Sequence, residues 1–292
     1  MSKASVNTET LGNARHFDRV QELLSRSLFR LSSGKKFVSA ADDPQAIGLA
    51  EKLTAQQRRV SAASINVQNA VSYLQTADGL VGAMGRMVTR MSELSLLASD
   101  VMKNAGDTAL YQTEFKQIQD QLRATIGGTT AEIGGTTDIT RPLGSYQGNP
   151  LFAANPAGQN ISAGETPSDI ITIPETNLRD GAMLALIQQD GSGNYTLSLT
   201  TAGAQTTIKD ALQELADERG SIGAVDRRFS LAAERLTKRG ESMTQSLSDI
   251  QDVDVAREAT RMTKYQMLAE SASTLLAQAN QSPKSVLQML RS

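Results

Sequence analysis

An unbroken heptad of apolar residues runs through the C-terminal half of the chain and limits the folds that it can adopt. From Ile208 to Ile250 every seventh residue is apolar, which is typical of a long helix that packs along one stripe. At about 1.5 Å per residue this helix is roughly 65 Å long, too long for a compact globule. The companion row, offset by four residues, is only partly apolar, so a two-stranded leucine zipper is not expected. We call the first row the rod seam: Ile208, Leu215, Ile222, Phe229, Leu236, Met243 and Ile250.

The N-terminal half carries a matching pattern. One row of apolar residues steps by seven from Val60 to Val88, and a second row steps by seven from Ala63 to Ala98. A third helix is expected after Gly106, with Tyr111, Phe115, Ile118 and Leu122 on one face. Two long striped helices in one chain predict an antiparallel bundle. The expected fold class is therefore mainly α, a long antiparallel helical bundle or coiled coil formed by the two flanks, with a small β-rich region between them.

Residues 127–207, which we call the insert, differ from both flanks. They hold 12 of the 22 Gly and 5 of the 7 Pro, but only 2 of the 29 Lys and Arg residues. Asp169–Ile173 and Met183–Gln189 are predicted to be strands. Asp190–Asn194 is predicted to be the loop of a hairpin that continues into the alternating segment Tyr195–Thr201. The insert is thus expected to be a small β region.

Two further amphipathic segments, residues 5–32 and 255–290, lie outside the rods. Gly34 is expected to end the first of them, Asp43 followed by Pro44 to begin the next helix, and Ser282 followed by Pro283 to begin a last one. Each segment exposes an apolar stripe if it is left alone. We therefore expect both to be loosely ordered in the monomer and to pack in an assembly. Residues expected to carry that packing are Phe17, Leu24, Leu31, Met262, Leu276 and Leu287.

Composition excludes several classes of protein. The 29 basic and 31 acidic side chains leave a net charge of −2, which argues against nucleic acid as the main partner. Without cysteine, the chain has no disulfide, no Cys-ligated zinc and no thiol catalysis. No stretch reaches the roughly 18 apolar residues of a membrane span. The first residues also lack the apolar core of a cleaved secretion signal, so we expect a cytoplasmic chain or one exported by another route.

No set of residues points to an enzyme. His16 is the single histidine, and a lone histidine on an amphipathic helix is more often a surface residue than a ligand. The adjacent Asp42 and Asp43 are explained by helix capping rather than by acid–base catalysis. The segment Ser33–Lys36 lacks the spacing of a phosphate-binding loop. We predict no catalytic residues, no cofactor and no metal site.

One stretch of the N-terminal rod stands out as a candidate contact surface. Along Thr89–Leu94, the residues Arg90, Glu93 and Leu94 fall away from the seam, and an exposed leucine beside an arginine is typical of such a surface. The alternative is a set of solvated side chains that contact a neighbouring subunit.

The N-terminal region resembles that of bacterial flagellins. The matching segments are Leu28–Gly34, Ser39–Pro44 and Gly48–Glu51. The end of the chain is similar to the closing signature of the same family in three segments, Met262–Leu268, Leu275–Pro283 and Val286–Leu290. The resemblance covers residues 5–126 and 208–290. Within the insert, only Gln147–Phe152 is similar to a short turn of the family.

This resemblance implies a structural subunit that polymerises into the flagellar filament for swimming motility. It implies an extracellular protein that is exported unfolded by the flagellar type III system, held beforehand by a chaperone at its C-terminal helix, and in contact with hook-associated and cap proteins. Terminal helices would line an inner tube, and the rods would form an outer tube. The implied domains are residues 1–42 (inner tube), 43–126 (rod), 127–207 (variable region), 208–253 (rod) and 254–292 (inner tube).

The resemblance also implies roles for the candidate contact surface. In the family this helix and the next form the surface read by Toll-like receptor 5, and the matching positions here are Arg90, Glu93, Leu94 and Glu114. The chain departs from the family pattern at Ser92, which replaces a second arginine, and at Ser95–Leu97. We expect recognisable but weakened binding of the depolymerised subunit.

Two alternatives stay open at this point. Asp43 followed by Pro44 is reminiscent of the hook–filament junction protein of the same superfamily, although the ending Ala277–Gln281 favours flagellin. The second alternative is a binding module whose amphipathic ends lie on a membrane or cap another filament. Residues 255–290 carry a net charge of only +2, which gives weak support to a membrane surface.

Overall fold

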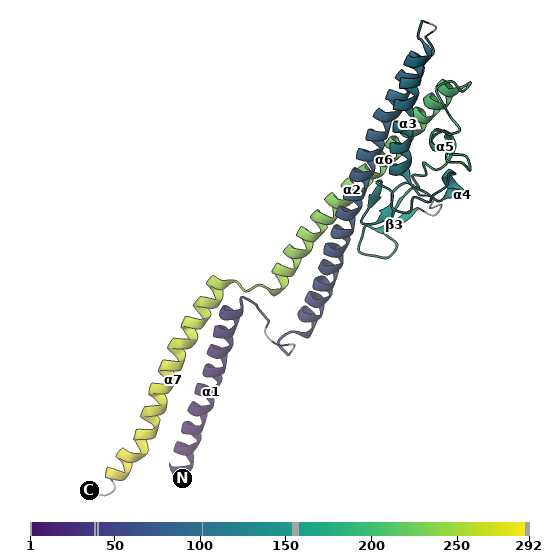
Figure 1. Cartoon of the computed structure of the whole chain (residues 1–292). Coiled ribbons are helices and arrows are strands. Elements are labelled where there is room, and N and C mark those ends of the chain that lie inside the picture. Colours follow the sequence, from purple (N-terminus) through teal and green to yellow (C-terminus); the bar gives the residue numbers. More distant parts are fainter. Residues whose placement is uncertain (1, 38, 40, 101, 154–157, 290–292) are drawn as a thin grey trace. The chain divides into compact units, whose positions relative to one another are not determined.

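The computed structural model describes residues 2–37, 39, 41–100, 102–153 and 158–289, and the side chains among them except those of 2–10, 280 and 282–289. Across these ranges the chain is mainly helical, with short strands confined to the insert (Figure 1), so the expected fold class is confirmed. The chain divides into two compact units, Met1–Gln57 with Glu241–Ser292 (unit 1) and Arg58–Gly240 (unit 2). Each unit is described by itself.

Unit 1 is built on two antiparallel helices, α1 (Ser2–Ser33) and α7 (Val255–Met289), which lie side by side (Figure 1). The expected break at Gly34 is confirmed, because its φ of 68° is a left-handed conformation that glycine adopts at little cost. The segments after α1 and before α7 are bonded to each other, since the Val253 amide donates to the Gly34 carbonyl at 2.9 Å. Both helical breaks therefore fall at one level.

Two proline sites in unit 1 behave differently. The first cap is confirmed: the Asp43 carboxylate accepts from the amides of Gln45 (3.1 Å) and Ala46 (3.0 Å), and Pro44 starts the next helix. The second is wrong, because α7 continues through Ser282 and Pro283 to Met289. A proline removes one backbone donor, and the good helix formers of Ala277–Gln281 keep the helix running up to it.

Unit 2 contains most of the two rods, α2 (Pro44–Ala98) and α6 (Ala204–Gln251), which run antiparallel (Figure 1). Asp78 of α2 pairs with Arg219 of α6 at 2.8 Å, and a Cβ on Gly240 would lie 3.9 Å from Val60. Both apolar rows of α2 are buried from Val60 to Met91. Six rod-seam residues are buried as well, and Ile250 is half-buried.

The companion row of α6 is not the one expected. The buried partners of the rod seam lie three residues after it rather than four, at Ala204, Ala211, Val225 and Ala232. In the expected row, Arg219 is exposed and Leu212 is half-buried. Heptad spacing alternates three and four residues, so a single apolar row does not say on which side its partner lies.

The third helix, α3 (Ala105–Ile126), follows a short turn after α2. It begins where the side chain of Asn104 accepts from the Asp107 amide at 2.9 Å. Phe115 and Leu122 are fully buried, while Tyr111 and Ile118 are half-buried. A three-helix arrangement of α2, α3 and α6 is therefore present at one end of unit 2 (Figure 1).

The insert holds two separate two-stranded antiparallel sheets, β1 (Ser145–Tyr146) with β2 (Asn149–Pro150), and β3 (Gln159–Ser162) with β4 (Ile170–Ile173). In the second sheet Asn160 lies opposite Thr172. The first turns at Gln147 and Gly148, both with positive φ, as a two-residue hairpin loop requires. The strand expected at Asp169–Ile173 is confirmed.

One expectation for the insert is wrong, and a second is confirmed only at the loop Asp190–Asn194, where the Asp190 amide donates to the Asn194 carbonyl at 2.8 Å. Met183–Gln189 is mostly helical, because it falls in α5 (Gly181–Ile187), which follows the short α4 (Thr130–Ile133). Helix-forming Met, Leu and Ala outweigh the apolar run there, and Glu214 of α6 accepts the amides of Ala182 and Met183 at 3.0 Å each. Tyr195–Thr201 makes a single bridge, Gln189 to Tyr195, and then turns away where the Ser198 amide donates to Thr201 at 2.9 Å.

In the part of the chain that the structure describes, no helix is both long and apolar enough to span a membrane.

Candidate assembly and contact surfaces

The register of α1 against α7 is set by a buried polar contact. The Ser27 hydroxyl donates to the Glu258 carboxylate, and both side chains are buried. Arg261 also donates to Glu258, at 3.3 Å. A buried polar contact of this kind loses its partner if the helices slip by one turn. The two helices are therefore held in a defined alignment.

The apolar residues expected to pack in the assembly are only partly covered by this pairing. Phe17, Leu24, Leu31, Met262 and Leu276 are half-buried, and Leu287 lies outside the residues whose side chains are described. Beside Phe17, Leu24 and Met267 lies an open groove of about 580 Å³. Met267 is 62% exposed. Other large apolar residues exposed on this unit are Leu11, Leu28, Phe29, Val255 and Leu275. Such a concentration of uncovered apolar surface marks an interaction face.

The candidate contact surface on α2 forms a small ion-pair cluster. The Arg90 guanidinium donates to Glu114 of α3 at 2.7 Å and to Glu93 at 2.9 Å. These hydrogen bonds raise the pKa of Arg90 and lower the pKa of the Glu114 carboxyl. All three side chains are well exposed. The cluster joins α2 to α3 and still presents its charges to solvent.

Leu94 does not belong to that surface. It was expected to be exposed, but it is 0% exposed. The adjacent Ser95 is buried too, whereas Glu93 is exposed. At this level α2 is joined to α3 by the ion pair of Arg90 and Glu114, and a helix with a neighbour on a second side buries a wider stripe than a single heptad seam. Leu94 therefore supports the surface from inside.

Two polar residues that the sequence analysis missed hold the insert on α3. Gln119 donates to the carbonyls of Leu186 (2.8 Å) and Leu197 (3.1 Å). Arg123 donates to the carbonyls of Ile133 (2.7 Å) and Ile187 (3.0 Å), among others. Burial lowers the pKa of Arg123. The available signal was their spacing, since residues 119 and 123 stand on the same face as Phe115, Leu122 and Ile126.

Glycine makes room for this arrangement. Gly134 has a φ of 68°, and a Cβ there would lie 2.0 Å from the Gln189 carbonyl oxygen. A Cβ on Gly135 would lie 2.6 Å from the Arg123 guanidinium. Only glycine allows the backbone to approach so closely.

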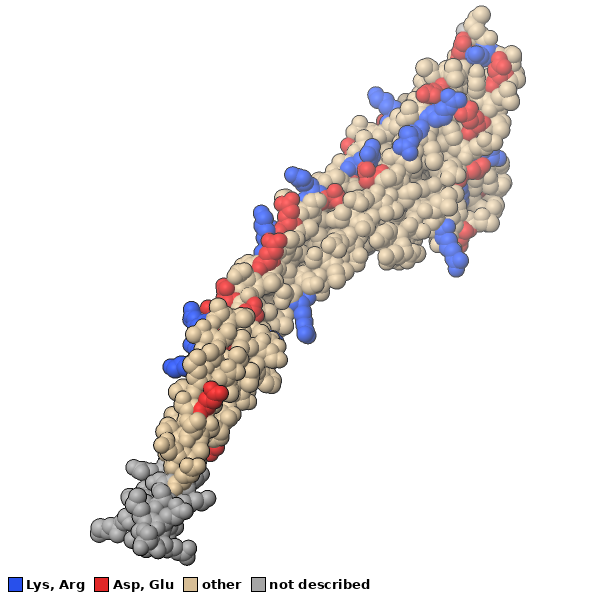
Figure 2. Space-filling model, turned by 90° about the vertical axis from the view of Figure 1, so that its left-hand side faces the viewer, with Lys and Arg blue, Asp and Glu red and all other residues tan. Residues whose placement is uncertain are grey.

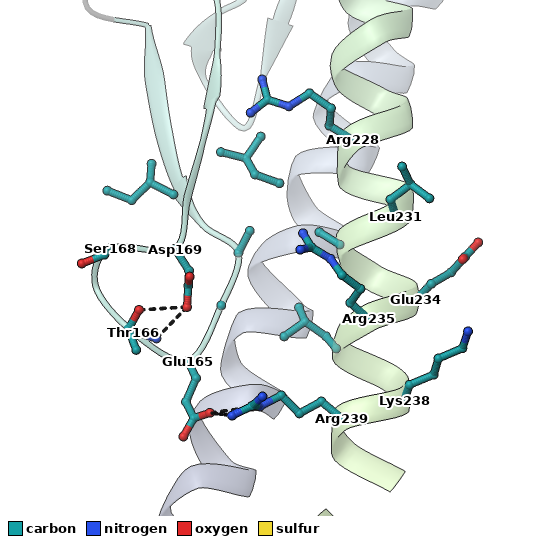
Figure 3. A pocket seen from close by; sticks show the side chains of 16 residues that line it. Glu165, Thr166, Ser168, Asp169, Arg228, Leu231, Glu234, Arg235, Lys238 and Arg239 are labelled. Atoms are coloured by element: carbon teal, nitrogen blue, oxygen red, sulfur yellow. Dashed lines mark hydrogen bonds and ion pairs between the residues drawn. The ribbon is translucent and has the colours of Figure 1, made fainter. Parts of the chain in front are cut away.

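A loop of the insert also reaches the rods. Between β3 and β4, Glu165 accepts from Arg239 of α6 at 2.7 Å and from Arg59 of α2 at 3.5 Å. Asp169 closes the loop by accepting from the Thr166 hydroxyl at 2.8 Å (Figure 3). The loop thereby bridges both rods at one level.

Charge is not segregated over the helices. On the face shown in Figure 2, acidic and basic side chains lie near one another along the long helices, and wide areas between them are uncharged. A mixed distribution of this kind gives no long-range field of one sign. Association at this face therefore depends on local contacts.

The chain matches two family models at its two ends. The bacterial flagellin N-terminal helical region matches residues 4–131, and the bacterial flagellin C-terminal helical region matches residues 206–290. Both models lie on the long helices, and the insert falls between them.

Curated relatives match over most of their length. The chain is 29% identical to a flagellin of Bacillus subtilis (strain 168), over 91% of the chain and 92% of the relative. It is 27% identical to a flagellin of Listeria innocua, over 99% and 100%. It is also 26% identical to the flagellar filament 33 kDa core protein of Treponema phagedenis, over 92% of each. With both terminal models in order on the helices that carry the exposed apolar face, the chain belongs to the bacterial flagellins, the structural subunits of the flagellar filament.

Proposed function

We propose that this flagellin enters the filament through the apolar faces that α1 and α7 leave uncovered. The observation that carries the proposal is the exposure of Met267, Phe29 and Leu275 on an otherwise ordered helix pair. Neighbouring copies would cover these side chains, and removing apolar surface from water drives association at about 25 cal/mol per Å². The expectation of loosely ordered terminal helices is thereby modified, since α1 and α7 first pack on each other.

The proposed division of labour follows the family. Residues 1–42 and 254–292 would form the inner tube, residues 43–126 and 208–253 the outer tube, and residues 127–207 the variable region that faces solvent. The insert supports this division because Gln119 and Arg123 fasten it to α3, Glu165 fastens it to α6 and α2, and its described residues form no long element.

Export and partners are proposed on the same basis. The chain would leave the cell unfolded through the flagellar type III system, as the resemblance to the family implies. A chaperone would cover α7 beforehand, because this helix exposes apolar side chains until a partner covers them. Hook-associated and cap proteins would meet the same terminal helices at the ends of the filament.

We further propose that Arg90, Glu93 and Glu114 contact neighbouring subunits and, on the free subunit, Toll-like receptor 5. Their exposed charges support this role. Leu94 would act only by supporting α2. No feature in the described part of the chain favours the hook–filament junction protein.

Seeded assembly tests the proposed function. The purified full-length chain is monomerised by heat or acid, returned to neutral pH with short filament seeds, and followed by negative-stain electron microscopy. We expect long tubes that extend the seeds. Monomers that only decorate the seed ends would contradict a filament subunit and favour a junction protein.

A further inference from the structure

A groove in unit 2 has the character of a docking surface. It measures about 1010 Å³ and lies between the β3–β4 loop, residues 163–171, and residues 228–239 of α6. Figure 3 shows Arg228 and Arg235 extending from α6 toward the loop, whereas Glu234 and Lys238 point away. Leu231 and Ile170, both on the lining, are each 48% exposed. We call this feature the loop groove.

The cations of the loop groove are only partly neutralised within the chain. Among the residues that the structure describes, Arg228 and Arg235 form no ion pair, while Arg239 and Arg59 share Glu165. Three arginines of the lining, Arg228, Arg235 and Arg239, therefore face two carboxylates, Glu165 and Asp169, and leave a net charge of +1 around exposed apolar side chains. The Glu165 contacts hold the loop in place, so the groove is a fixed feature of unit 2.

A second uncovered surface lies where α2 turns into α3. Leu96, Leu97, Met102 and Leu110 are all exposed there, and Met102 is 86% exposed. Residues 90–114 carry four carboxylates against two cations, a net charge of −2. Two of those carboxylates, Asp100 and Asp107, flank Met102. We call this feature the hairpin tip.

The hairpin tip and the loop groove of one copy cannot meet. Arg59, which bonds the groove loop, and Leu97, at the tip, belong to the continuous helix α2. At 1.5 Å per residue they are separated by about 55 Å along that helix. The two surfaces are complementary in charge and share an apolar centre, so the tip of one copy fits the groove of another. A contact between two different surfaces of identical copies repeats from copy to copy, and it builds a filament when the rotation between copies does not close a ring.

We propose that the hairpin tip of each subunit docks into the loop groove of a neighbouring copy, with Met102 and Leu110 against Leu231 and Ile170 and with Asp100 and Asp107 facing Arg228 and Arg235. This contact rests on the proposed function, because it is a contact between copies in the filament. It assigns a specific partner surface to the insert, which otherwise only covers the rods.

Cross-linking in seeded filaments tests the pairing, and the cysteine-free chain makes the test clean. The double variant Met102→Cys/Leu231→Cys is assembled and treated with a short bismaleimide. Because the two thiols of one copy are too far apart to react, the expected product is a covalent ladder of oligomers. The matched control is Met102→Cys/Thr237→Cys, whose second thiol stands on an exposed position of α6 outside the groove lining and should give at least about fivefold less ladder. Equal ladders, or none, overturn the proposal.

A second experiment exchanges the charges of the groove and the tip. Arg228→Glu/Arg235→Glu should raise the critical concentration for elongation at least about fivefold, and so should Asp100→Lys/Asp107→Lys. Combining all four changes should recover most of the loss, because the exchanged charges again face each other. Thermal melts of each monomer separate this effect from unfolding. Unchanged elongation of the single-sided variants, or a combined loss that is merely additive, overturns the proposal.

Electron microscopy of the wild-type chain with the same seeds distinguishes a failure of the proposed contact from a failure of the proposed function. If it extends seeds and the ladder or the recovery fails, the tip-to-groove contact is wrong and the filament function stands. If it extends no seeds, the filament function fails and the contact fails with it.

Discussion

The two units of this flagellin use similar apolar stripes with opposite results. In unit 2 the stripes of α2 and α6 face each other, and the residues from Val60 to Met91 and from Ile208 to Leu236 on the seams are buried. In unit 1 the stripes of α1 and α7 also meet, yet Phe29, Met267 and Leu275 stay exposed.

The difference lies in what stands beside each helix pair. Unit 2 adds α3 and the insert, which cover further faces of the rods and are fastened by buried hydrogen bonds. In unit 1 only the first turns of α2 and the last turns of α6 accompany this pair among the described residues, and large apolar side chains of the pair stay exposed. We propose that stable folding and assembly fall to separate units, because unit 2 covers its own stripes while unit 1 leaves a face that neighbouring copies can cover.

Removing α7 should have the largest effect, because it should abolish assembly through unit 1 and leave unit 2 folded. A chain without residues 255–292 should form no filaments, because α1 loses both its partner and its share of the assembly face. Unit 2 should stay largely helical, since its seams do not involve α7. Electron microscopy with seeds and far-ultraviolet circular dichroism check both halves. Filaments from the truncated chain would show that assembly does not depend on unit 1.

A matched pair of alanine substitutions, one in each unit, tests whether buried and exposed apolar residues contribute differently to stability. Phe229→Ala, inside the unit 2 seam, should lower the free energy of unfolding by about 3–5 kcal/mol, because it leaves a cavity. Leu275→Ala, on the exposed face of unit 1, should change it by less than about 0.5 kcal/mol. Urea unfolding of the monomers measures both.

In seeded elongation, the order of the two effects should be reversed. At a temperature where both monomers stay folded, Leu275→Ala should slow elongation more than Phe229→Ala does. The comparison would be contradicted if the more destabilised monomer were also the poorer polymeriser under these conditions.

Arg123→Met should separate the insert from the rods of unit 2. Methionine fills a similar volume, but it leaves the Ile187 carbonyl buried without its side-chain donor and leaves the Ile133 carbonyl only the Gln189 amide, which costs about 2–3 kcal/mol. Hydrogen exchange should accelerate in residues 127–203 and stay slow in α2 and α6. Uniform acceleration in both regions would mean that the insert and the rods unfold as one.

Much of the long-helix part of the chain could be predicted from spacing and from capping residues. A stripe sustained over many heptads indicates one long helix, so the rods could be predicted from it. The break at Gly34 and the cap at Asp43 could be predicted from the residue types that end and begin helices. The side of the companion row could not be predicted, because positions three and four residues away lie at similar angles to the seam. Leu94 was misplaced for a related reason, since its burial depends on α3, whose contact with α2 no periodicity in α2 reports.

The insert was predicted less well, because its elements are short and are held by distant residues. The helix α5 has seven residues, and its first amides bond to Glu214 on another helix. The roles of Gln119, Arg123 and Glu165 likewise depend on carbonyls and guanidinium groups far away in sequence. At the candidate surfaces, the exposed charges of Arg90, Glu93 and Glu114 could be read from the sequence, while the loop groove arises only when loop and α6 meet.

The smallest expected effect concerns two carboxylates of unit 2 whose pKa values move in opposite directions. Burial raises the pKa of Glu214, although the amides of Met183 and Ala182 and the nearby Asp180 also act on it. The folded chain then holds this proton at higher pH than the unfolded chain does, so stability is lost as pH rises from about 4.5 through the raised pKa. A glutamine side chain at this position keeps an acceptor oxygen but does not ionise. The free energy of unfolding of Glu214→Gln, relative to wild type, should therefore increase between pH 4 and pH 7.

The pH dependence of stability that Glu114 contributes should have the opposite sign. Arg90 lowers its pKa, so the pair contributes stability above the ordinary glutamate pKa, and that stability is lost as pH falls through the lowered value. Relative to wild type, Glu114→Gln should become less stable as pH rises over the same range, by a small amount because the pair is solvent-exposed. Urea titrations at several pH values measure both slopes. The two differences in unfolding free energy should change with pH in opposite directions. A change in the same direction would mean that Glu214, partly buried against the insert, and Glu114, exposed between α2 and α3, do not have the different electrostatic environments that the geometry indicates.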